Sequence, residues 1–95
     1  MSFEIFITES VKDKIRGWRL SPYLIFRIEE RLYGELADHP SRRLQRLPKP
    51  ADILQFSFCV EGKEEPPLDY LFVFDVAYTV DEERLVIRDC DYLSG

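Results

Sequence analysis

Residue types that often carry chemistry are scarce in this sequence of 95 residues. It contains two cysteines, one histidine and four glycines. Two cysteines are too few for a disulfide scaffold, and no second cysteine or histidine stands at the spacing of a metal site. We therefore expect Cys59 and Cys90 to be free thiols, and we expect the chain to use no metal or other cofactor.

Long apolar runs and a targeting segment are also missing. No run approaches the roughly 18 apolar residues that a membrane-spanning helix requires. The opening residues, MSFEIFITES, lack the basic-then-apolar pattern of a signal peptide. The sequence contains no glycine-rich phosphate loop, nucleophile elbow or His/Cys zinc pattern. We expect a cytoplasmic protein with no membrane partner.

The chain does contain ample core material and an uneven charge. It is 45% hydrophobic and 14% aromatic, and its length fits one domain over residues 1–95. Residues 1–49 hold ten Lys/Arg and seven Asp/Glu, whereas residues 50–95 hold three and eleven. This asymmetry predicts a surface for an anionic partner or another for a cationic one, the alternative being two solvated surfaces of opposite sign.

Hydrophobic periodicity predicts a strand and two helices in the first half. Residues 3–8 alternate, as in a half-buried strand. Capping residues follow, and Val11, Ile15 and Trp18 then recur at helical spacing. A second helix is predicted over 22–38, with a wide apolar stripe. We expect His39 to interact with the dipole at the end of this helix rather than to act in catalysis.

The second half reads as strands. A basic loop is predicted over 41–52, followed by a strand at 53–61 and a solvent-exposed loop at 62–69. A central strand at 70–80, a turn at 81–83 and a last strand at 84–93 follow. The order β-α-α-β-β-β predicts an α+β fold. In it, two N-terminal helices pack on one face of a twisted, mainly antiparallel sheet.

Three stretches carry a resemblance to a known family. They are FEIFITESVKDKIRGWRL, RIEERLYGELADHPSRRLQRLP and LDYLFVFDVAYTVDEERLVI. In order and length they resemble the RelE/ParE superfamily of small bacterial toxins, over nearly the whole chain. The resemblance implies a toxin–antitoxin protein that is neutralised by an antitoxin helix laid along its groove. If active, it would be a metal-independent, ribosome-dependent endoribonuclease acting on mRNA; gyrase is the target in the ParE branch.

The family's RNA-cleaving members typically present Lys, Arg, Tyr or His on the concave face of the sheet. Here Leu71 stands where the family signature has arginine. Polar or small residues replace the expected cations on the preceding strand, at Gln55, Ser57 and Cys59. Near the end of the chain only Arg88 and Tyr92 keep suitable residue types, and they are the catalytic candidates that the resemblance implies.

Four cations form the best candidate for a nucleic-acid contact. Arg42, Arg43, Arg46 and Lys49 lie within ten residues, and together they could neutralise several phosphates. No aromatic residue is interleaved among them to stack a base. The alternative is a solvated connector whose charges complement a helix dipole.

Carboxylates gather where the family would place cations. Asp75, Asp89 and Asp91 are predicted on neighbouring strands. They could form a cluster for a metal or for acid–base chemistry; alternatively Asp75 faces solvent or pairs with an arginine such as Arg88 across the ladder. At 4 Å and an effective dielectric near 20, a like charge beside a phosphate costs about 4 kcal/mol. The alternative function is therefore a catalytically inactive, protein-binding module with an acidic surface. Two alternatives stay open for Cys59 and Cys90: they are neighbours in the sheet, or they serve as small hydrophobic residues, as buried thiols commonly do.

Overall fold

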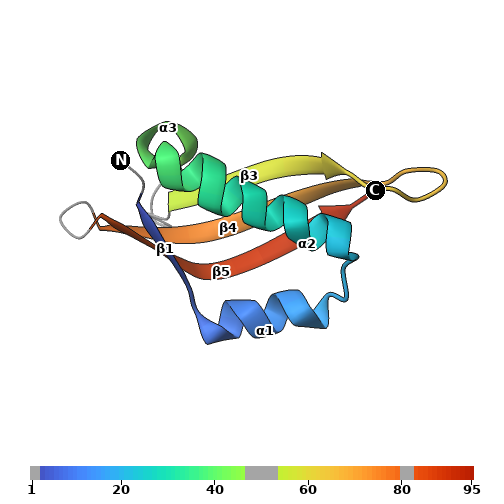
Figure 1. Ribbon diagram of the computed structural model, residues 1–95, viewed down its shortest axis with the longest axis horizontal. Coiled ribbons are helices and arrows are strands. Elements are labelled where there is room, and N and C mark those ends of the chain that lie inside the picture. Colours follow the sequence, from blue (N-terminus) through green and yellow to red (C-terminus); the bar gives the residue numbers. More distant parts are fainter. Residues whose placement is uncertain (1–2, 47–53, 80–82) are drawn as a thin grey trace.

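The computed structural model describes residues 3–46, 54–79 and 83–95. Its elements run β1 (Glu4–Ile7), α1 (Glu9–Gly17), α2 (Pro22–Glu29), η1 (Glu30–Leu36), α3 (Pro40–Arg43), β2 (Gln45–Arg46), β3 (Leu54–Glu61), β4 (Asp69–Thr79) and β5 (Arg84–Ser94). The strands form one sheet in the order β1-β5-β4-β3-β2 (Figure 1). The pair β1–β5 is parallel and the other pairs are antiparallel. The predicted fold class is confirmed, with one additional strand.

Local signals in the sequence explain where the first helices begin. The Thr8 hydroxyl accepts a hydrogen bond from the Val11 amide, and the Ser21 hydroxyl accepts one from the Leu24 amide. Pro22 occupies the first turn of α2, where its missing N–H costs nothing. The predicted helix over 22–38 is present; its second half, η1, has the wider π-type hydrogen bonding.

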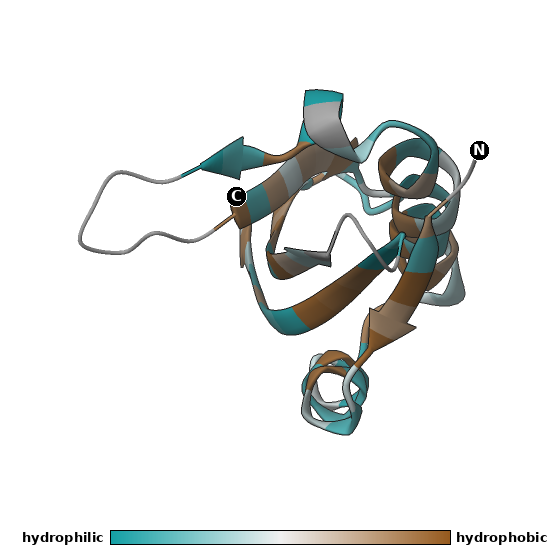
Figure 2. Ribbon diagram, turned by 90° about the vertical axis from the view of Figure 1, so that its left-hand side faces the viewer, coloured by the Kyte–Doolittle hydropathy of each residue, from teal (hydrophilic) through white to brown (hydrophobic). Residues whose placement is uncertain are grey.

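The core lies between the helices and one face of the sheet. Alternate residues of β3 and β4 point inward and are nearly inaccessible, Phe72 and Phe74 completely so. Val11 of α1 and Leu24, Ile28, Leu32 and Leu36 of α2 and η1 cover them. In Figure 2, α1 seen end-on turns its apolar side toward the sheet.

The prediction of a basic loop over 41–52 was wrong in its first part. Pro40 begins a one-turn helix, α3, and residues 45–46 form a short strand that pairs with the start of β3. Proline fits the first turn of a helix, which explains why the chain turns again after His39. Residues 47–52 of the predicted loop lie outside the described residues. No helix among the described residues is long and apolar enough to cross a membrane.

Candidate functional site on the open sheet face

The face of the sheet turned away from the helical core carries most of the polar side chains of β3, β4 and β5 that are candidates for a site. Because inward and outward residues alternate along each strand, the register assigns its members. We call the following residues the open face: Gln55, Ser57, Cys59 and Glu61 of β3, Asp69, Leu71, Val73 and Asp75 of β4, and Asp89, Asp91 and Leu93 of β5.

A bulge in β5 decides which of its residues reach this face. Asp75 is paired with Asp89 and Val76 with Ile87, so Arg88 has no partner in the ladder. The extra residue shifts the alternation by one position. As a result Leu85 and Ile87 point inward before the bulge, whereas Cys90 does so after it.

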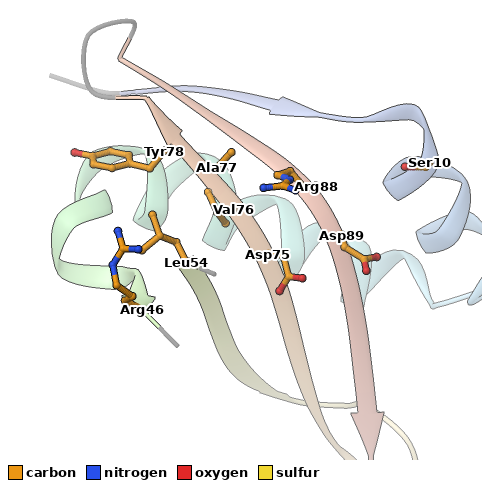
Figure 3. A pocket seen from close by; sticks show the side chains of 9 residues that line it. All are labelled: Ser10, Arg46, Leu54, Asp75, Val76, Ala77, Tyr78, Arg88 and Asp89. Atoms are coloured by element: carbon orange, nitrogen blue, oxygen red, sulfur yellow. The ribbon is translucent and has the colours of Figure 1, made fainter. Parts of the chain in front are cut away.

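A cavity of about 590 Å³ opens beside the bulge (Figure 3). Its lining comes from α1, β2, β3, β4 and β5: Ser10, Arg46, Leu54, Asp75, Val76, Ala77, Tyr78, Arg88 and Asp89. Figure 3 shows Asp75 and Asp89 on neighbouring strands, with Arg46 on one side of them and Ser10 on the other. Cations and carboxylates therefore share the walls of the cavity.

Asp89 is held as a charged group. Its Oδ1 accepts a hydrogen bond from the Cys90 amide at 2.8 Å and lies 3.2 Å from Lys14 Nζ. The amide and then the ammonium lower the pKa of Asp89, because both favour its ionised form. The same contact with Asp89 raises the pKa of Lys14. Lys14, a cation at the border of the open face, is thus already paired with Asp89.

Asp75 faces another carboxylate rather than a cation. It stands directly opposite Asp89 in the ladder. Among the described residues it makes no ion pair, with Arg88 or with any other cation. Of the two predicted alternatives, the pair with Arg88 is therefore not formed, and Asp75 lies half-buried on the open face. No group of three or more His, Cys, Asp or Glu in the described part of the chain is arranged to hold a metal ion.

The two catalytic candidates lie in different surroundings. Arg88 is exposed and lines the cavity beside the bulge. Tyr92 is half-buried on the helix-covered face, where its ring centroid is 4.7 Å from that of Trp18 and 5.9 Å from that of Phe72. The structure therefore does not bring them together on one surface, and a catalytic role for either stays a prediction.

The four predicted phosphate contacts are also dispersed. Arg42 is exposed on α3, while Arg43 Nε lies 3.1 Å from Glu35 Oε1 and so fastens α3 to η1. Arg46 lies on β2 and lines the cavity. Lys49 is outside the described residues. Nucleic-acid binding by this set stays a prediction.

Sequence reasoning missed Lys14 and Ser10 as members of the site. Both lie on α1, and only the pairing of β1 with β5 brings that helix to the bulge. The helical spacing of Val11, Ile15 and Trp18 leaves Lys14 on the outer side of the helix but contains no signal for its distant partner Asp89. The predicted closeness of Cys59 and Cys90 was wrong, because Cys59 is opposite Leu71 and exposed, whereas Cys90 is opposite Phe74 and buried.

A second hollow, of about 470 Å³, lies between α1 and the α2–η1 helix. Its apolar members are Ile7, Ile15, Ile25, Ile28, Leu32 and Tyr33, and its polar members are Lys12, Arg16 and Glu29. Tyr33 is 52% exposed, so part of this apolar surface faces solvent. We call this hollow the helix groove.

Comparison with known proteins gives a match in structure only. No protein-family model matches the sequence, and no curated protein does. The structure is similar to a chain in the crystal structure of the toxin–antitoxin complex RelBE2 from Mycobacterium tuberculosis. The similarity covers 98% of this chain and 100% of that chain, with a TM-score of 0.74 and 14% identity. At this identity the likeness concerns the fold alone, and it confirms the fold that the resemblance predicts.

Proposed function

We propose that this chain is the toxin-like component of a cytoplasmic toxin–antitoxin pair and is bound by a protein antitoxin. The observation that carries the proposal is the fold, which is similar over its whole length to a chain of a toxin–antitoxin complex. The helix groove supports it independently. An exposed apolar groove between helices suits an amphipathic helix, whose anchors recur at i, i+3 or i+4, and i+7.

The partner can be tested by expressing the chain alone and together with its neighbouring open reading frame. We expect growth arrest in the first case, and rescue with a co-purifying partner in the second. Tyr33→Glu places a charge in the helix groove and should weaken the complex at least about tenfold, because an unpaired charge is buried on binding.

Phe26→Glu is the matched control for this variant. Phe26 is also an exposed aromatic on the same helical stretch, at 59% exposure, but it does not line the groove. Its substitution should leave the complex intact. The absence of both growth arrest and a co-purifying partner would refute the proposal. If the two variants weaken the complex equally, the helix groove is not the binding site of the antitoxin.

For the toxic activity we propose metal-independent cleavage of mRNA on the ribosome. Arg88 and Arg46 line the cavity, where their positive charges would stabilise the developing charge of a phosphorane. Arg88→Gln should then lower the cleavage rate about 10²-fold. Changing Arg42, Arg43 and Arg46 to Gln should remove roughly three phosphate contacts from the salt dependence of RNA binding. If wild-type protein cuts no mRNA and binds no RNA at low salt, this activity is excluded.

A second candidate function is a protein-binding module that keeps the fold without the RNA chemistry. It is favoured by the open face, where Asp75, Asp89 and Asp91 stand in place of cations. A phosphate brought beside them would meet like charge. Ribosome-dependent mRNA cleavage by the purified protein would refute this candidate.

A further inference from the structure

The open face is ordered in rows across its three strands. Cys59, Leu71 and Leu93 form an apolar row, and Leu93 is 70% exposed. On one side of it Glu61 is paired with Asp69. The other side holds the rows Ser57–Val73–Asp91 and Gln55–Asp75–Asp89. An exposed apolar strip thus lies between two acidic borders.

A small hollow of about 180 Å³ lies on the second of these borders. Lys14, Val73, Asp75, Asp89, Cys90 and Asp91 line it. Three carboxylates face one ammonium there, and that ammonium contacts Asp89. Among the described residues Asp75 and Asp91 make no ion pair, so the negative charge of the lining exceeds the positive charge.

We propose that the open face binds a basic segment of a partner protein. An arginine or lysine of that segment enters the hollow between Asp75 and Asp91, and a neighbouring apolar side chain packs on Leu71 and Leu93. The inference rests on the second candidate function, protein binding, and adds the site and the chemistry of the partner. An arginine suits the hollow best, because its planar guanidinium can bond two carboxylates at once.

Charge and shape select this occupant over the others. An RNA strand would bring phosphates to a face whose open acids repel them. A bare metal ion would leave the apolar row uncovered, and no described group of carboxylates has the arrangement to hold one. A basic segment with apolar residues would cover the apolar row and neutralise the acidic hollow. The hollow is compatible with a cation, since the chain's own Lys14 ammonium lies 3.2 Å from an oxygen of Asp89 in its lining.

The test uses a fluorescein-labelled peptide of alternating leucine and arginine, with alternating leucine and glutamate as the control peptide. Binding is followed by fluorescence anisotropy at low salt, and the amide shifts of Leu71, Val73 and Leu93 locate it by NMR. We expect the arginine peptide alone to bind. Asp75→Asn and Asp91→Asn should each weaken it about fivefold, which corresponds to one partly exposed ion pair.

Two further variants separate this site from a general charge effect. Glu65→Gln removes an exposed acid of the β3–β4 loop. When the affinities of wild type and this variant are compared at 0.15 M salt, they should differ less than about twofold, because charges farther apart than about 8 Å are then largely screened. Lys14→Met removes the competing cation and should tighten binding about fivefold. If these residues had only a structural role, the Asp variants would not weaken peptide binding while Lys14→Met strengthens it.

Other outcomes overturn the inference. The first is that the arginine peptide does not bind, or that both peptides bind equally. The second is that all four variants change the affinity equally. The third is that millimolar Mg²⁺ displaces the peptide while a monovalent salt of the same ionic strength does not. The proposed functions have separate readouts, mRNA cleavage and co-purification with the neighbouring gene product. If cleavage occurs while the arginine peptide still binds the open face, the second candidate function loses only its claim that the RNA chemistry is absent. Its protein binding, on which this inference rests, is kept.

Discussion

Replacing Asp75 by asparagine is expected to make the protein more stable. Asp75 and Asp89 are directly opposite in the ladder, where Cβ atoms lie about 4.5–5.5 Å apart. Two unit charges about 5.5 Å apart in a medium as polar as water repel by about 0.8 kcal/mol. The half-buried position of Asp75 raises this figure, and Lys14 beside Asp89 lowers it. A gain of about 0.8 kcal/mol raises the melting temperature of a domain this size by about 3–6 °C.

Thermal unfolding of wild type, Asp75→Asn and Asp91→Asn measures this effect. Asp91 is the control, because it is opposite Val73 and its neutralisation removes no directly facing charge. The advantage of Asp75→Asn should nearly vanish in 1 M salt, where the screening length is about 3 Å. A variant no more stable than wild type at low salt, or an advantage that salt leaves unchanged, would contradict the reasoning.

Three further predictions follow from buried and charged groups. Phe72→Ala should lower the free energy of unfolding by about 3–5 kcal/mol in urea melts, because Phe72 is completely inaccessible. A chromogenic disulfide reagent should modify exposed Cys59 at once and Cys90 only on unfolding, since burial raises the pKa of Cys90 to about 11. The lowered pKa of Asp89 gives stability that is complete above its unfolded value near 3.9 and is lost as the pH falls through the folded value. In an NMR titration Lys14→Met should move the pKa of Asp89 upward.

The sequence predicts those parts of the fold that local patterns specify. Alternation identified the strands around Phe56 and Phe72, and the hydroxyl caps at Thr8 and Ser21 marked where helices begin. The short strand β2 escaped prediction because two residues carry no periodicity, and its pairing with β3 is a tertiary contact. The pattern predicts that the second helix ends at residue 38 but not that another begins at Pro40, because proline is found both after helices and in their first turn.

The candidate site was less accessible to sequence reasoning because it depends on register. One extra residue at Arg88 changes which side chains of β5 reach the open face, and no composition signal marks such a bulge. The acidic character of this face was visible in Asp75, Asp89 and Asp91. That Asp75 would meet Asp89, and that Lys14 would join them from α1, follows only from the assembled sheet.

The parallel pairing of β1 with β5 has a consequence for how the chain folds as it is made. Ile5 is paired with Leu85, 80 positions later in the chain. At about 5–20 residues per second, the ribosome needs roughly 4–16 s to synthesise that interval. Through this time β1 lacks its neighbour, and α1 lacks the strand against which it packs. Contacts so distant in sequence make folding slow and leave apolar surface open to chaperones or to a partner made alongside. The first strand to be synthesised, β1, is thus among the last to pair in the sheet.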